Sequence, residues 1–223
     1  MEFQKGKKLA IFGASILVFN TIGSIVLNYL IRGFEIGLSE AVSQLRTVIS
    51  SLIDIAGLLL VLIGAKHIVE EIKRREIYKN LLAAFIIYII SISISILFTG
   101  LTARSTNSSA LLTMLVPYLS LLYFILYLIS QGVLIPVSFV RLGTAFNSII
   151  LKISGTLLFI SAILPLLSGY IFAPLYKLSS TWILQLVIII IQLIITTTYI
   201  LLLLGFAFLK MPASTEIKGT VQE

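Results

Sequence analysis

Uncharged apolar stretches dominate this chain of 223 residues. A helix that crosses a bilayer needs about 20 mostly apolar residues, and six stretches satisfy this length: residues 8–31, 47–67, 81–101, 112–140, 153–176 and 181–209. Backbone groups inside lipid must be hydrogen-bonded internally, which a helix achieves within one segment. The sequence therefore predicts an all-α fold, an integral membrane bundle of about six transmembrane helices in which residues 1–223 form a single transmembrane helical domain.

The composition leaves no room for a separate soluble domain. Charged residues make up only 11% of the chain, whereas soluble domains contain about 25%, and the mean hydropathy is +1.13. There is no cysteine and only one histidine, His67, which excludes a zinc site built from Cys and His ligands. We expect a multi-pass cell-membrane protein in contact with the lipid bilayer, without cofactor or metal. We attribute the net charge of +7 to the loops and expect no nucleic-acid partner.

The sixteen Lys and Arg residues are distributed unevenly between the two sides of the predicted bundle. With the N-terminus inside, twelve fall on the inner side: Lys5, Lys7, Lys8, Lys66, Lys73, Arg74, Arg75, Lys79, Arg141, Lys152, Lys210 and Lys218. Four fall on the outer side: Arg32, Arg46, Arg104 and Lys177. Because short cytoplasmic loops carry an excess of Lys and Arg, this ratio predicts that both termini are cytoplasmic, N-in and C-in.

Two outer loops carry features of their own. Residues 32–46 place apolar side chains on one helical stripe, so they form either a short amphipathic helix on the membrane surface or an extension of the second span. In the next outer loop, Asn107-Ser108-Ser109 matches the acceptor pattern for N-glycosylation. Asn107 is therefore a candidate glycosylation site on the predicted outer side.

The inner loop at residues 65–80 is rich in charge. Glu70 with Arg74, and Glu71 with Arg75, have the i,i+4 spacing that supports a helix. This spacing predicts that the second helix continues beyond the membrane before the chain turns back. The charged surface is either simply solvated or a docking surface, and the sequence leaves both open.

Asp54 is the one acidic residue inside a predicted span. Its insertion costs about 3 kcal/mol, whereas each Leu, Ile or Val contributes about −0.5 kcal/mol. The nine such residues between Leu52 and Ile63 together contribute roughly −4.5 kcal/mol, so the helix still inserts. No Lys, Arg or His lies at a similar depth in any span. Asp54 is therefore either protonated or in contact with water or a cation.

Small and polar residues suggest which neighbours Asp54 meets. Asp54 shares a helical stripe with Ser50, Gly57 and Gly64, and such stripes favour close helix contact. The first span carries Asn20, Ser24 and Asn28 on one face, and the sixth carries Gln185, Gln192, Thr196 and Tyr199. Counted from the outer ends, Ser24 lies level with Asp54. We predict an intramembrane polar cluster made of Asp54, Asn20, Ser24, Asn28 and Gln192.

The fourth span is the least regular, because it contains Pro117, Gly132 and Pro136. It is either one kinked helix or a shorter helix followed by a re-entrant segment. Interrupted helices can mark the binding sites of transporters. A bend or a helix end explains the same residues without any site, so both interpretations stay open.

Three segments carry a resemblance to known proteins. They are KKLAIFGAS near the N-terminus, GLLLVLIGAKHI at 57–68 and REIYKNLLAAF at 75–85. The chain resembles an uncharacterised family of archaeal and bacterial multipass membrane proteins, a domain of unknown function. The resemblance implies a membrane protein of unassigned role, and it brings no catalytic or binding residue to this sequence.

Three functions compete, and the third, a membrane enzyme, would need chemistry that the sequence does not contain. The chain has no Gly-x-Ser-x-Gly motif and no phosphate-binding loop, so we predict a protein without a catalytic site. The first expectation is an accessory or assembly subunit of a membrane complex, in contact with other subunits or with copies of itself. The alternative is a small transporter or channel for a proton, ion or small solute that uses Asp54. In the first case Asp54 holds helices together, and in the second it binds cargo.

Overall fold

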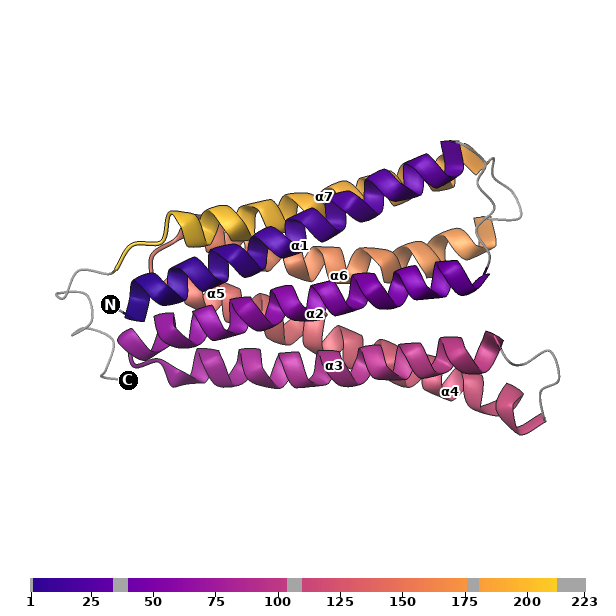
Figure 1. The fold of residues 1–223 in the computed structure, drawn as a ribbon, viewed down its shortest axis with the longest axis horizontal. Helices are drawn as coiled ribbons and strands as arrows, with labels where there is room; N and C mark the ends of the chain where they lie inside the picture. The colour runs from indigo at the N-terminus through magenta and orange to yellow at the C-terminus, as the bar shows by residue number, and fades with distance from the viewer. Residues whose placement is uncertain (1, 34–39, 104–109, 176–180, 212–223) are drawn as a thin grey trace.

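The computed structural model describes residues 2–33, 40–103, 110–175 and 181–211, and in these residues it contains helices and turns only. The all-α prediction is therefore confirmed. The elements are α1 (Glu2–Gly33), α2 (Glu40–Glu71), α3 (Arg75–Ala103), α4 (Ala110–Tyr127), the π-helix η2 (Leu128–Leu134), α5 (Ile135–Ala145), α6 (Ile149–Leu175) and α7 (Thr181–Ala207). α4, η2 and α5 follow one another without a break, as Figure 1 shows.

Most of these helices are long and apolar enough to cross a membrane. Among the described residues, α1, α2, α3, the α4–η2–α5 span and α7 meet this description, and α6 adds a shorter apolar stretch over Ile149–Leu164. The bundle is therefore that of a membrane protein. α1 and α2 begin six and seven residues before the predicted spans at 8 and 47, so both helices extend beyond the apolar stretches.

The helices form a closed ring in which sequence neighbours pack side by side and α1 also packs against α7 (Figure 1). α1 begins and α7 ends at the same end of the bundle. There the Lys7 Nζ atom donates a hydrogen bond to the Leu209 carbonyl oxygen, at 3.0 Å. A cation at this position also interacts favourably with the carboxyl end of a helix. We call this the terminal end of the bundle and the opposite one the far end.

Among the side chains that the structure describes, the hydrophobic core lies in the half of the bundle nearest the terminal end. Its largest fully buried side chains include Phe139, Phe206, Leu17, Ile68, Leu142, Leu151 and Leu202. The rings of Phe139 and Phe206 meet edge to face, with centroids 6.0 Å apart and planes at 79°. These side chains come from α1, α2, α5, α6 and α7, so apolar packing closes this half of the bundle from all sides.

Small residues at every seventh position bring α1 and α2 into backbone contact. A Cβ atom on Gly13 would lie 2.5 Å from the Gly57 carbonyl oxygen, and one on Gly64 would lie 2.5 Å from that of Gly6. One heptad further along both helices, Asn20 hydrogen-bonds Ser50. We call this set the heptad ladder: Gly6, Gly13 and Asn20 of α1 opposite Gly64, Gly57 and Ser50 of α2. A repeat of seven keeps one stripe of each helix facing its partner.

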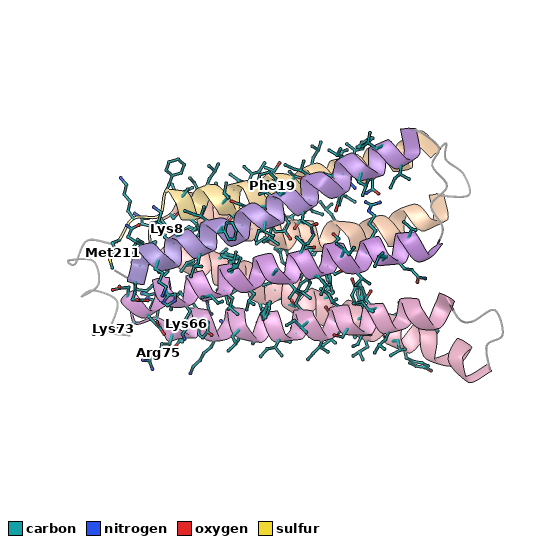
Figure 2. The ribbon with its side chains drawn as sticks, in the orientation of Figure 1. Lys8, Phe19, Lys66, Lys73, Arg75 and Met211 are labelled. Carbon is teal, nitrogen blue, oxygen red and sulfur yellow. The ribbon has the colours of Figure 1, made fainter. Side chains whose placement is uncertain are left out.

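Basic side chains gather at the terminal end, where Figure 2 labels Lys8, Lys66, Lys73 and Arg75. Phe19 instead projects from the middle of α1 and is 75% exposed, as a side chain facing lipid would be. Most of the described Lys and Arg side chains lie at the terminal end, whereas Arg46 lies in the far half. The N-in and C-in prediction depends on this uneven distribution. Which side of a membrane the terminal end occupies stays a prediction.

The inner loop differs from its prediction in one respect. α2 does continue past the apolar stretch, to Glu71, but the chain then turns through Lys73, whose φ is 57°. Because the helix ends at this left-handed residue, Glu70 and Arg74 do not share a helical face. Among the described residues, no ion pair joins Glu70 to Arg74 or Glu71 to Arg75, so the predicted i,i+4 pairs are wrong.

The outer loops are described only in part. Residues 40–46 belong to α2, which favours the predicted extension of the second span over a separate surface helix. Residues 34–39 and the candidate glycosylation site Asn107 lie outside the described residues.

A substitution in the heptad ladder tests the backbone contact between α1 and α2 directly. We expect Gly13→Ala to destabilise the protein by about 1–3 kcal/mol, because the new methyl group would overlap the α2 backbone. Gly23→Ala on the same helix is the matched control, because a Cβ there meets nothing within 4 Å. Unfolding midpoints in detergent measure both. Equal midpoints for the two variants would contradict the backbone contact.

Candidate functional site

Asp54 lies near the middle of α2, half-buried, fourteen residues after Glu40 and seventeen before Glu71. The Asn20 side-chain amide donates to its Oδ1 atom at 2.7 Å. The same Nδ2 atom lies 3.1 Å from the Ser50 carbonyl oxygen and 3.1 Å from the Ser50 hydroxyl. One amide on α1 therefore binds two successive turns of α2 and fixes the orientation of the carboxylate.

The other members of the predicted cluster lie elsewhere. The Ser24 carbonyl oxygen accepts a hydrogen bond from Arg46 Nη2 at 3.2 Å, one turn nearer the far end. Asn28 is half-buried on α1, and none of the described hydrogen bonds joins it to Asp54. Gln192 lies on α7, where its backbone carbonyl oxygen accepts a hydrogen bond from Thr196 Oγ1 at 2.8 Å. The structure thus brings Asn20 to Asp54 and does not show contact of Ser24, Asn28 or Gln192 with the carboxylate.

Three tyrosines complete the surroundings of Asp54. Tyr88 of α3, Tyr127 at the end of α4 and Tyr199 of α7 lie close enough to the carboxylate for its charge to act on their hydroxyl groups. The sequence analysis placed Tyr199 on a polar face but missed Tyr88 and Tyr127. Their position in mid-span was the available signal, because membrane tyrosines usually lie at the interfaces.

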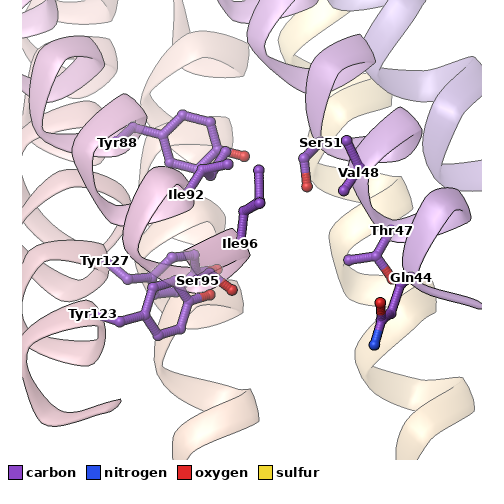
Figure 3. Close-up of a pocket in the computed structure, with 10 residues that line it drawn as sticks. All are labelled: Gln44, Thr47, Val48, Ser51, Tyr88, Ile92, Ser95, Ile96, Tyr123 and Tyr127. Carbon is purple, nitrogen blue, oxygen red and sulfur yellow. The ribbon is translucent and has the colours of Figure 1, made fainter. Parts of the chain in front are cut away.

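A cavity of about 290 Å³ lies between α2, α3 and α4 in the far half of the bundle. Figure 3 shows Tyr88, Tyr123 and Tyr127 on one side and the α2 residues Thr47 and Ser51 on the other. The rings of Tyr123 and Tyr127 have centroids 6.0 Å apart. Ser51 precedes Asp54 by three residues, so the cavity ends about one helical turn from the carboxylate.

A second hollow opens between α1 and α2, with a volume of about 690 Å³. It begins where the heptad ladder ends, at Asn20 and Ser50, and widens toward Arg46. Apart from these groups and Ser24 its lining is apolar, and Phe19, Leu45 and Ile49 are exposed there. Asp54 therefore lies at the level where the close contact of α1 and α2 gives way to open space.

The fourth span changes its winding at this same depth. The Ile135 N–H donates to the Ser130 carbonyl five residues earlier, the bond that defines a π-helix. Pro136 explains the change, because its ring would clash with the carbonyl four residues before it in a regular α-helix. The span is therefore continuous rather than broken. Ser130 is fully buried, and its hydroxyl has no hydrogen-bond partner, which is unusual.

The donor groups limit what the site can bind. Among the described residues there is no group of three or more His, Cys, Asp or Glu side chains that could hold a metal ion. His67 lies at the terminal end, where its Nδ1 atom is 2.7 Å from Oε2 of Glu2. That contact ties α1 to α2 well away from Asp54. The candidate site thus offers one carboxylate, one amide and several tyrosine hydroxyls.

No protein-family model, curated protein or solved structure matches this chain. The resemblance to an uncharacterised multipass family therefore stays a prediction. The inference of function depends on the geometry of the chain itself.

The Asn20–Asp54 contact predicts how two substitutions will differ. Asp54→Leu removes the acceptor at 2.7 Å and leaves the Asn20 amide only its longer contacts with Ser50, so we expect a loss of about 0.6–1.7 kcal/mol of stability. Asp54→Asn retains a carbonyl oxygen and should unfold close to the wild type. Unfolding midpoints in detergent compare the two. A fully stable Asp54→Leu protein would show that the contact contributes nothing to folding.

Proposed function

We propose that this protein is a membrane carrier for a monovalent cation and that Asp54 binds the cation. The observation that carries the proposal is the position of this carboxylate in the bundle interior. Its Oδ1 atom accepts a hydrogen bond from Asn20, and its charge acts on tyrosines of three other elements. Carboxylates inside membranes are costly, and they commonly mark ion pathways.

The polar groups exceed what helix packing requires. The α1–α2 contact is already made by the glycines of the heptad ladder, so Asp54 is not needed to bring these helices together. A hydrogen bond between transmembrane helices contributes only about 0.6 kcal/mol on average, whereas insertion of Asp costs about 3 kcal/mol. The free energy of helix packing therefore does not offset the cost of inserting the Asp54 carboxylate, whereas cation binding gives this carboxylate a function.

The two halves of the bundle differ in the way that a carrier requires. The cavity between α2, α3 and α4 lies toward the far end and ends about one helical turn from Asp54. On the terminal side of Asp54, buried side chains such as Leu17, Phe139 and Phe206 fill the bundle. A carrier exposes its site to one side of the membrane at a time. We infer that this conformation is open toward the far end and closed toward the terminal end.

A monovalent cation fits the donor set better than a divalent one. Ca²⁺ and Mg²⁺ take about six or more oxygen ligands in tight geometry, usually with several carboxylates. Asp54 is the only carboxylate described within the spans, and one of its oxygens already accepts from Asn20. One negative charge balances one positive charge and leaves the loaded site neutral.

Transport measurements test the proposal. The purified protein is reconstituted into liposomes, and currents are recorded on a solid-supported membrane after jumps of H⁺, Na⁺, K⁺ or methylammonium. We expect at least one of these cations to give a current, and we expect Asp54→Asn to reduce it at least tenfold without loss of folded protein. Glu70→Gln is the matched control, because it removes an exposed carboxylate from the same helix.

Two results would contradict the proposal. A current unchanged by Asp54→Asn would show that Asp54 does not bind the cargo. No current above that of empty liposomes for any cation would favour the other function, an accessory or assembly subunit, in which Asp54 only joins helices.

A further inference from the structure

We infer that the cavity between α2, α3 and α4 binds a small organic cation, an alkylated ammonium, through the ring faces of Tyr88, Tyr123 and Tyr127. This inference rests on the proposed function for its link to transport, because the bound ammonium would then be the cargo that reaches Asp54. The observations that make the cavity a binding site do not depend on the proposed function.

The size and depth of the cavity suit a small ligand. Its volume of about 290 Å³ is close to the lower limit of ligand pockets, which span roughly 300–1,000 Å³. The three tyrosines are half-buried, so part of each ring remains available to a ligand. As Figure 3 shows, they come from two helices and face α2 across the cavity.

Aromatic rings in this arrangement favour a particular kind of cation. A cation near the face of an aromatic ring gains about 0.5–2 kcal/mol, more when the site excludes water. Quaternary and alkylated ammonium ions are bound in this way by groups of aromatic side chains. They carry their charge on a large apolar surface, so they do not need the close oxygen ligands that a small inorganic ion needs. The three tyrosines offer aromatic surface, and Ile92 and Ile96 add apolar surface beside it.

The charges around the cavity also select a cation. None of the residues that line it is Lys, Arg or His. Arg46, the nearest described cation along α2, lines the other hollow and donates to Ser24 there. The carboxylate of Asp54 acts on both Tyr88 and Tyr127. A positive ligand is therefore attracted to the cavity, and an anion is repelled.

Hydroxyl groups of α2 lead from the cavity toward the carboxylate. Thr47 and Ser51 lie one turn apart on the cavity side of α2, and Asp54 follows less than one turn later. A ligand held by the tyrosines would thus have its countercharge on the terminal side of the cavity.

Binding of choline to the purified protein in dodecyl maltoside tests the inference, with isothermal titration calorimetry as the measurement. Choline carries the trimethylammonium group, and 3,3-dimethylbutan-1-ol is its uncharged analogue of the same shape. We expect choline to bind at least tenfold more tightly than the alcohol. Equal affinities would overturn the inference, because the cavity would then recognise shape without charge.

Three substitutions separate the contribution of the tyrosine ring to choline binding from that of its hydroxyl group. Tyr127→Leu removes the ring and should weaken choline binding about fivefold or more, whereas Tyr127→Phe keeps the ring and should stay within about twofold. Tyr118→Leu is the control, because Tyr118 lies on the same helix but is 71% exposed. If Tyr127→Leu does not fold, Tyr123→Leu replaces it. Unchanged binding in the leucine variant, or equal loss in the Tyr118 control, would overturn the inference.

The two proposals fail in different ways. Choline that binds, together with no Asp54-dependent current for any of the cations tested, supports the cavity and contradicts the carrier. An Asp54-dependent current of Na⁺ or H⁺, together with no detectable choline binding, supports the carrier and overturns the inferred ammonium site.

Discussion

Backbone contact between α1 and α2 is the constraint on which the rest of the structure depends. At Gly6, Gly13, Gly57 and Gly64 the backbones of the two helices approach each other directly, so these glycines set the separation and register of α1 and α2. In lipid there is little hydrophobic force between helices, and close packing of small residues replaces it. The register fixed by these glycines is what places Asn20 opposite both Ser50 and Asp54.

The same contact divides the bundle into two halves of different character. Toward the terminal end, glycine spacing lets apolar side chains of α1, α2, α3, α5, α6 and α7 meet in a continuous core. Beyond Asn20, the next ladder position of α1 is Leu27, and the hollow lined by Leu27, Arg46 and Ile49 opens between the helices. The polar groups are concentrated where the two halves meet. A charged group costs least at such a boundary, because water or a ligand can reach it from the open half.

The sequence was sufficient to predict the class of fold but only part of the candidate site. Long apolar stretches identify membrane helices because the bilayer imposes their length and composition. Depth counted from the ends of the apolar stretches put Ser24 level with Asp54, whereas the structure pairs Asp54 with Asn20, one turn deeper. The count was wrong because α2 begins at Glu40, seven residues before the apolar stretch, and the glycines rather than the stretch ends set the register.

Counting depth from the ends of the apolar stretches could not predict which spans far apart in the sequence lie in contact. Tyr88 and Tyr127 approach Asp54 only because α3 and the fourth span close the ring beside α2. Nothing in one sequence fixes the order of helices around a ring. Likewise, Pro136 predicted an irregularity in the fourth span, but the sequence did not show whether the chain would bend, break or widen there. In the structure α6 packs against this turn, with Gly155 close to the Pro136 carbonyl oxygen.

The π-helical turn at Leu128–Leu134 changes which residues of the fourth span lie on the same side of the helix. A π-turn takes up one more residue than an α-turn, so residues on either side of it are out of angular phase with each other. Tyr123 and Tyr127 precede the turn, and Phe139 follows it. One continuous span can therefore direct its tyrosines into the cavity of the far half and its phenylalanine into the apolar core of the other. A helical wheel drawn through the whole span would misplace one of these two faces.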